Sequence, residues 1–218
     1  MTDADRLPFH RKGKGLAKTG PAFITKADPG EPWGGKKREL KRLVNPNDIS
    51  RLVVFDTWVC NTDRYSHNED GSVRRRIDNV FLSENAPAGK LLLRAVDHTH
   101  CFTSGREILA KNLGASLIRD NRVFGLFPEF ETFLNRRAVR EAAADLRQMT
   151  MATAKAIVST IPAEWDVSAG GRSALVDFVV KRAAYLSEDV LRGTDPEPRI
   201  MILLWPQGEM FDSDEPER

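Results

Sequence analysis

The chain has 218 residues, of which 41% are hydrophobic and 29% are charged, a composition typical of a globular protein with a sizeable core. It contains no run of about 18 apolar residues that could span a bilayer, and its N-terminus lacks the apolar segment of a signal peptide. The two cysteines, Cys60 and Cys101, are too few for a disulfide framework and fit a reducing compartment. These features predict a cytoplasmic protein with no membrane partner.

Charge is unevenly distributed, although the formal net charge is only +2 at pH 7. Residues 1–44 carry eleven Lys or Arg against five acidic residues. Within them, residues 1–36 are rich in Gly and Pro with little apolar periodicity, which predicts a loop-rich basic arm. We expect a folded lobe over residues 37–206, followed by an acidic disordered tail at 207–218. The arm lacks interleaved aromatic residues and recognition motifs, so we do not expect nucleic acid as a partner.

A predicted helix leads directly into a polar loop. A short helix is expected over Lys37–Leu43, and Asn45-Pro-Asn-Asp48 then offers turn and N-cap residues to a longer helix over Ile49–Val59. This helix is followed by Asn61-Thr-Asp-Arg64, whose polar groups are costly to bury unless they have partners. The change from apolar to polar residues makes the loop a candidate site.

The rest of the sequence predicts a β-hairpin followed by helices. The hairpin strands are expected at Asn79–Leu82 and Lys90–Val96. Later elements are helices over residues 106–118, 137–160 and about 171–192, and an apolar run over 200–205, either a strand or buried coil. The expected fold class is α+β and mainly α-helical, with a short β-hairpin at the site and a C-terminal helical bundle.

Three polar side chains lie where predicted elements begin or end. Asp63 lies in the loop after a helix, Asn79 opens a strand, and Asp97 closes the next strand. Phosphoryl transfer in kinase-like folds uses this order, because a carboxylate accepts the hydroxyl proton while an Asn oxygen and a second carboxylate hold Mg²⁺. Taken singly, each residue is more typical of a helix cap, a turn or a surface ion pair. Together, and in this order, they favour a phosphotransfer site.

Three motifs carry a family resemblance. Asn61-Thr-Asp-Arg64, Asp78-Asn-Val-Phe-Leu82 and Val96-Asp-His-Thr-His-Cys-Phe102 resemble the catalytic and metal-binding loops of HipA-like kinases. Gly125-Leu-Phe-Pro-Glu-Phe130 and Ile161-Pro-Ala-Glu-Trp165 are less specific matches. The resemblance runs from about residue 20 to residue 191. It implies the C-terminal catalytic lobe of a protein-kinase-like fold.

The resemblance also implies an activity and a set of site residues. It implies a Ser/Thr kinase or small phosphotransferase that uses ATP and Mg²⁺ on an unidentified hydroxyl-bearing substrate, of the kind found in toxin-antitoxin systems. The implied roles are Asp63 and Arg64 as catalytic residues, Asn61 and His98 beside the cofactor, and Asn79 and Asp97 as metal ligands. For Arg64, a structural ion pair is an equal alternative to contact with phosphate.

The position of the metal-binding Asn departs from the family pattern. The usual Asn lies five residues after the catalytic Asp, which would select Asn68. Asn68 precedes turn residues, whereas Asn79 leads straight into a predicted strand, so we favour Asn79 as the metal ligand and keep Asn68 as the alternative. Residues 66–77 are then expected to form an inserted loop beside the site.

A second departure concerns the nucleotide. Kinase-like enzymes grip the phosphates with a glycine-rich loop and a strand lysine of an N-terminal lobe, and the sequence before Asp48 does not predict one. We therefore expect the chain by itself to bind ATP weakly, and an N-lobe or antitoxin-like partner to strengthen that binding. One alternative is a non-catalytic pseudokinase or split-kinase binding module. A third hypothesis is a zinc hydrolase using His98, His100, Cys101 and Cys60, although this spacing is atypical of zinc sites.

Overall fold

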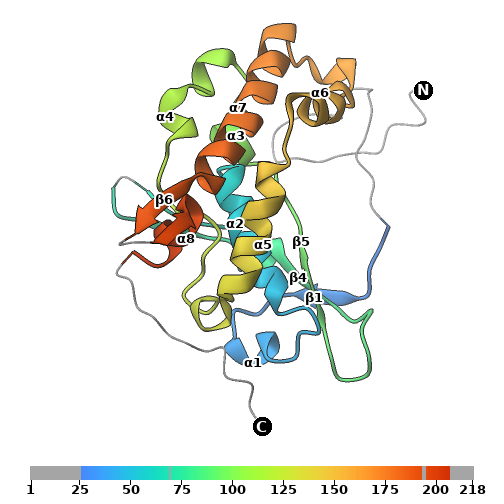
Figure 1. Cartoon of the computed structure of the whole chain (residues 1–218). Helices are drawn as coiled ribbons and strands as arrows, with labels where there is room; N and C mark the ends of the chain where they lie inside the picture. The colour runs from blue at the N-terminus through green and yellow to red at the C-terminus, as the bar shows by residue number, and fades with distance from the viewer. Residues whose placement is uncertain (1–25, 69, 193–194, 207–218) are drawn as a thin grey trace, which may run out of the picture.

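A long helix, α7 (Ala169–Ser187), runs through the middle of the computed structural model, and α2, α5, α6 and α8 pack against it (Figure 1). The structure describes residues 26–68, 70–192 and 195–206. The first part of the expected arm and the expected acidic tail, residues 1–25 and 207–218, lie outside the described residues. The molecule is of the α+β class, with helices and small antiparallel sheets. Its helices are α1 (Lys37–Leu40), α2 (Asn47–Trp58), α3 (Cys101–Ser104), α4 (Ala115–Ile118), α5 (Arg136–Arg147), α6 (Met151–Ser159), α7 and α8 (Arg199–Leu204).

Helix α2 confirms the helix predicted at Ile49–Val59. Its apolar residues recur at helical spacing and bury one face against α5 and α7. The helix ends at Trp58, and Cys60 then takes a left-handed conformation with φ of +51°. A left-handed residue of this kind is typical of a helix end, and the polar loop follows it.

The predicted hairpin is also confirmed, and it belongs to a three-stranded sheet. Strands β4 (Val80–Ser83) and β5 (Leu92–Ala95) are antiparallel, and β1 (Gly30–Pro32) pairs with the other edge of β4. The strand β1 lies in a segment expected to be loop. It forms because Trp33, which follows it, is buried against Phe127 and Phe130 and so holds the preceding backbone at the sheet edge.

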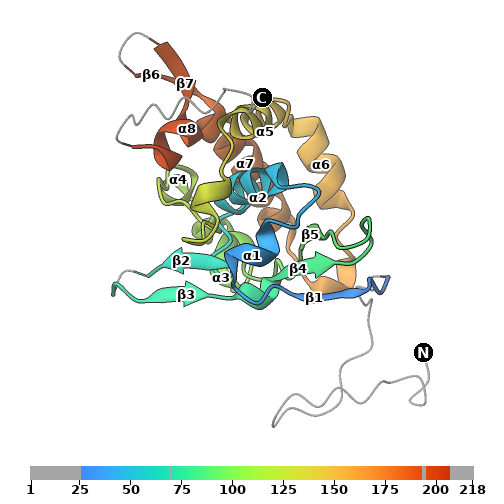
Figure 2. The same ribbon diagram turned by 90° about the horizontal axis from the view of Figure 1, so that it is seen from below.

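Residues expected to form an inserted loop instead form a second hairpin, β2 (Tyr65–His67) and β3 (Val73–Arg75). Figure 2 shows this hairpin and the β1–β4 pair along one side of the molecule, with the helices stacked over them. The register places Ser66 opposite Arg74, so the chain returns to its starting point within ten residues. A third hairpin, β6 (Asp189–Arg192) and β7 (Asp195–Pro198), follows α7.

Three predicted helices differ from the structure. The one at residues 106–118 is broken into short turns, since Leu109 and Gly114 have extended backbones. The one at 137–160 is divided between α5 and α6, because the Thr150 hydroxyl accepts a hydrogen bond from the Thr153 amide and starts a new helix. The last ends at Ser187 and not at residue 192, where the chain enters β6.

The apolar run at residues 200–205 is a helix, α8, and neither a strand nor coil. A run this short has no clear periodicity, so its packing decides its conformation. The helical form places Ile200, Met201 and Leu204 on one buried face against α5 and α7. In the described ranges, no helix combines the length and apolar character needed to cross a membrane.

Arg182 joins two parts of the core from the middle of α7. Its guanidinium is fully buried and donates hydrogen bonds to backbone carbonyls at the C-terminal ends of α2 and α4 and just beyond, among them Thr57 at 2.7 Å and Leu117 at 2.9 Å. Helix C-termini present unpaired carbonyls with partial negative charge, which a cation satisfies. Arg182 therefore fixes the end of α2, from which the candidate site loop starts.

Candidate functional site

Asp63, Asn79 and Asp97 are placed by three different segments that meet at one edge of the sheet. Asp63 follows α2 by a short loop, Asn79 immediately precedes β4, and Asp97 follows β5. Because β4 and β5 are antiparallel and Val80 pairs with Ala95, the start of one strand lies beside the end of the other. The Asn79 side chain donates a hydrogen bond from Nδ2 to Asp63 Oδ2 at 2.9 Å. Asp63 and Asn79 are both buried.

A chain of contacts joins the two carboxylates of the site. His100 Nδ1 lies 3.9 Å from Asp63 Oδ2 and 3.2 Å from Thr99 Oγ1. Thr99 Oγ1 in turn donates to Asp97 Oδ1 at 2.6 Å. Hydrogen bonds from Thr99 lower the pKa of Asp97, so this carboxylate stays ionised at neutral pH. Asp97 is exposed and Asp63 is 3% exposed, so the cluster opens to solvent on the Asp97 side.

Arg64 lies behind this cluster and holds its segments together. Its side chain is 0% exposed, and Nε donates to Asp56 Oδ2 at 2.6 Å. The same guanidinium donates to the backbone carbonyls of Asn79 and Val96, and its Nη2 lies 3.2 Å from His98 Nε2. A guanidinium enclosed by these groups cannot reach a ligand that enters from solvent. Arg64 is therefore a positioning residue. Its ion pair with Asp56 is the structural alternative to contact with phosphate.

Asp56 is a site residue that the sequence reasoning missed. It is fully buried on α2, and burial raises its pKa, while the Arg64 guanidinium and the Asn61 amide oppose that shift. Asn61 donates from Nδ2 to Asp56 Oδ1 at 3.0 Å and accepts from the Asp63 amide at 3.2 Å. Asn61 thus transmits the position of α2 to the backbone of Asp63. The signal was present in the sequence, since Asp56 follows Leu52 by four residues on the apolar face of the helix.

Gly125, in one of the less specific motifs, makes room for this buried pair. Its φ is +75°, and a Cβ atom at this position would lie 2.3 Å from Asp56 Oδ2. Its amide donates to the carbonyl of Tyr65 at 2.9 Å, which ties the segment to β2. A side chain at this position would displace the Asp56 carboxylate, so the residue must be glycine.

The other two predicted site residues, His98 and Asn68, lie apart from each other. The His98 ring packs edge-on against Phe55 with centroids 5.5 Å apart, and burial and the Arg64 charge lower its pKa, although the residue keeps exposed surface. Asn68 lies at the turn end of the β2–β3 hairpin, where its Nδ2 donates to Ser72 Oγ at 2.8 Å. The structure therefore brings Asn79, and not Asn68, to Asp63.

The residues of the zinc hypothesis do not form a metal-binding group. Cys60 and Cys101 are buried, and burial raises the pKa of each thiol to about 12. Within the described residues, no group of three or more His, Cys, Asp or Glu side chains is placed to hold a metal ion. Asp63, Asn79 and Asp97, here called the Asp63 cluster, offer two carboxylates and one amide.

Arg74 on β3 and Arg76, just after this strand, border the site. Arg74 Nη1 lies 3.5 Å from Asp63 Oδ1. Arg76 pairs with Asp78 through two hydrogen bonds of 3.1 and 2.9 Å. Both lie within residues 66–77, which the sequence predicted to lie beside the site.

The backbone around the site is strained. Of the described residues other than glycine, five have positive φ, and four of them border the site, namely Cys60, Asp97, Phe102 and Ser104. Residues with side chains adopt this conformation at a cost of about 1–3 kcal/mol each, and such strain persists where the surrounding structure enforces it, often at functional sites. Here the Phe102 amide donates to the Val59 carbonyl at 2.7 Å, which ties the loop after Asp97 to the loop before Asp63.

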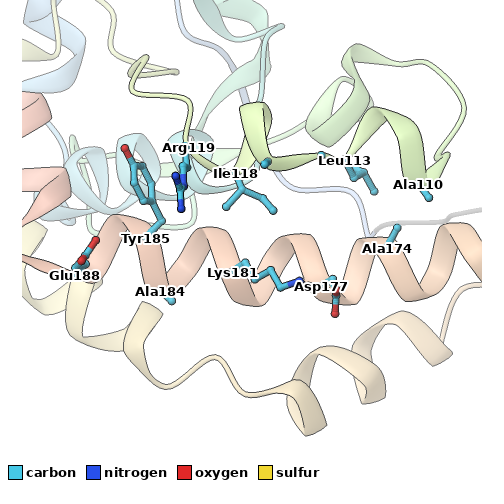
Figure 3. Close-up of a pocket in the computed structure, with 12 residues that line it drawn as sticks. Ala110, Leu113, Ile118, Arg119, Ala174, Asp177, Lys181, Ala184, Tyr185 and Glu188 are labelled. Atoms are coloured by element: carbon cyan, nitrogen blue, oxygen red, sulfur yellow. Dashed lines mark hydrogen bonds and ion pairs between the residues drawn. The ribbon is translucent and has the colours of Figure 1, made fainter.

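A separate groove lies between α7 and residues 110–119. It has a volume of about 730 Å³ and shares no lining residue with the Asp63 cluster. Figure 3 shows Lys181 and Tyr185 of α7 and Glu188, just after this helix, along one wall and Ile118 and Arg119 along the other. Its lining mixes alanines with charges of both signs, so it does not select an obvious ligand.

Comparison of the chain with models of protein families, with curated proteins and with solved structures finds no match.

Proposed function

We propose that the Asp63 cluster is the site of a phosphotransferase that moves the γ-phosphate of ATP to a hydroxyl group, in a lobe that resembles the C-terminal lobe of HipA-like kinases. The observation that carries this proposal is the 2.9 Å hydrogen bond from Asn79 to Asp63, made where the Asn79 carbonyl accepts a hydrogen bond from the amide of Val96, the residue before Asp97. It joins segments that are 16 residues apart in the sequence and brings together the residue types that phosphoryl transfer uses.

The donor set suits Mg²⁺, a hard cation that prefers oxygen ligands. The amide nitrogen of Asn79 faces Asp63, which directs its oxygen to the other side of the amide group. Oδ1 of Asp97 accepts two hydrogen bonds from Thr99. The other carboxylate oxygen, Oδ2, is therefore the one suited to a cation. Asn79 and Asp97 would hold the ion, which neutralises charge on the phosphates when bound.

Asp63 is suited to receive the proton of the acceptor hydroxyl. The bond between the hydroxyl oxygen and the γ-phosphorus forms, the bond from that phosphorus to the diphosphate breaks, and the hydroxyl proton passes to the Asp63 carboxylate. Asn79 fixes Oδ2 of this carboxylate and Asn61 fixes its backbone, so the base does not need to be reoriented during the reaction. The diphosphate leaves with the negative charge.

The test is a phosphotransfer assay with radiolabelled ATP at millimolar concentration and Mg²⁺, using the full 218-residue chain and measuring autophosphorylation. We expect Asp63→Asn to lower the rate by about 100-fold or more, since proton transfer typically contributes 10²–10⁴-fold, and to leave Mg²⁺-nucleotide binding within about threefold. Asp97→Asn is expected to weaken the Mg²⁺-dependent binding itself.

Asn68→Ala is the matched control, because Asn68 is the alternative metal ligand and lies at the turn of the hairpin. It should leave both the rate and the binding unchanged. Full activity in Asp63→Asn and Asp97→Asn would exclude the assignment. Binding without turnover in the unaltered chain would instead favour the non-catalytic binding module.

A further inference from the structure

We propose that Arg74 binds the phosphate groups of the substrate at this site, an inference that rests on the proposed phosphotransferase function. Arg74 lies on β3 of the hairpin between the candidate base and Asn79. Its Nη1 is 3.5 Å from Asp63 Oδ1, so its guanidinium borders the cluster on the side of Asp63 that Asn79 does not occupy.

The hairpin holds Arg74 in this position. Successive side chains of a strand point to opposite faces, so Arg75 and Arg74 diverge. Arg75 faces the body of the protein, where it makes two hydrogen bonds of 3.1 and 2.9 Å to Glu129 and its guanidinium carbon lies 5.3 Å from the centre of the Phe127 ring. The Arg76 backbone amide also donates a hydrogen bond to the backbone carbonyl of Arg64 at 2.9 Å. These contacts anchor β3 and direct Arg74 to the site.

Arg74 has hydrogen-bonding capacity that its neighbours lack. Arg75 and Arg76 are each paired with a carboxylate through two hydrogen bonds. In the described part of the chain, Arg74 has an ion pair at 3.5 Å, which is longer than an ordinary charge-assisted hydrogen bond of about 2.7–2.9 Å. The Arg74 side chain is also 44% exposed. Its planar fork of donors is therefore available to a ligand that enters from solvent.

The charge of the site favours a polyphosphate as the ligand of Arg74. Asp63, Asp97 and Asp78 bring negative charge to one small region, and Arg76 offsets one of these charges by its pairing with Asp78. A polyphosphate would be repelled unless further positive charge met its oxygens. Bound Mg²⁺ supplies part of that charge, and Arg74 supplies the rest with donor geometry that matches phosphate. When Arg74 turns to the phosphate, it also frees Asp63 Oδ1 to accept a proton.

The test is calorimetry of the full chain with inorganic tripolyphosphate and Mg²⁺, which probes the phosphate site without the nucleoside. We expect Arg74→Ala to weaken binding about tenfold or more, and Arg74→Lys to bind at an intermediate strength because it keeps the charge and loses the fork. Arg137→Ala is the matched control. It removes the same charge from an 86% exposed arginine on α5, and it should change the affinity less than twofold.

The outcomes separate this inference from the function on which it rests. If Asp97→Asn weakens tripolyphosphate binding while Arg74→Ala binds like the unaltered chain, the role of Arg74 is refuted and the phosphotransferase site stands. If Arg74→Ala and Arg137→Ala weaken binding equally, only net charge matters and the inference is also refuted. If the unaltered chain does not bind Mg²⁺-tripolyphosphate at millimolar concentration, both proposals fail. Thermal unfolding of each variant shows whether the fold is retained.

Discussion

Replacing Arg64 with Met tests the buried ion pair that supports the site. Met has a similar volume and no charge, so Asp56 is left as a fully buried carboxylate with one side-chain partner, the amide of Asn61. Removing one member of a buried pair costs about 3–5 kcal/mol, which is a large part of the roughly 5–15 kcal/mol that stabilises a typical domain. The substitution also removes donors from the carbonyls of Asn79 and Val96. We expect a loss of about 3–5 kcal/mol in the free energy of unfolding at pH 7.5.

The pH dependence of this variant has a defined sign. Without the guanidinium, burial raises the pKa of Asp56 above its ordinary 3.8 with less opposition. The folded state then binds more protons than the unfolded state between 3.8 and the raised pKa, so stability falls as pH rises through that window. Arg64→Met should therefore lose less stability at pH 5 than at pH 7.5.

The assay is urea denaturation followed by the fluorescence of the four tryptophans, at both pH values. The double variant Asp56→Leu with Arg64→Met removes both charges, and we expect it to recover about 1–3 kcal/mol relative to the sum of the two single variants. If a single variant is too unstable to measure, the double variant, which has no unpaired buried charge, can still be measured. A loss below about 1 kcal/mol for Arg64→Met, or strict additivity in the double variant, would refute the reasoning.

Two further substitutions test the packing around the site and the anchoring of β7. Gly125→Ala should destabilise the fold by about 2–4 kcal/mol in the same denaturation assay, because it combines a left-handed backbone with a Cβ 2.3 Å from Asp56 Oδ2. Gly71→Ala is the control, because Gly71 has φ of +80° with open space around it, and it should cost about 1 kcal/mol. Equal losses in the two variants would contradict the clash. Burial acts to raise the pKa of Glu197 on β7, but hydrogen bonds from two α5 arginines hold it below its ordinary 4.5. The contribution of Glu197 to stability, about 1 kcal/mol, is therefore present above pH 4.5 and is lost as pH falls through the lowered pKa. The difference in stability between the unaltered chain and Glu197→Gln should therefore vanish in acid, and a difference that grows in acid would contradict this assignment.

Several elements followed from the sequence because they depend on local patterns. Helix α2 has apolar residues at helical spacing, and β4 and β5 are short apolar segments separated by turn residues, so both were predicted near their observed bounds. The helix breaks were not predicted. They depend on single residues such as Thr150, whose hydroxyl starts a new helix inside a continuous helical pattern, and on packing that turns the residues 200–204 into a helix.

The sequence alone determined that Asp63, Asn79 and Asp97 would be placed at the ends of elements, since the order of helix, strand and strand sets where each polar residue emerges. Only the tertiary structure decided which asparagine meets Asp63, because residues 65–75 fold back as a hairpin that carries Asn68 away and returns the chain to Asn79. The partners of Arg64 and Arg182 were also decided at this level. Their hydrogen bonds reach carbonyls up to 32 and 125 residues away, and such contacts depend on how whole elements pack and not on any local pattern.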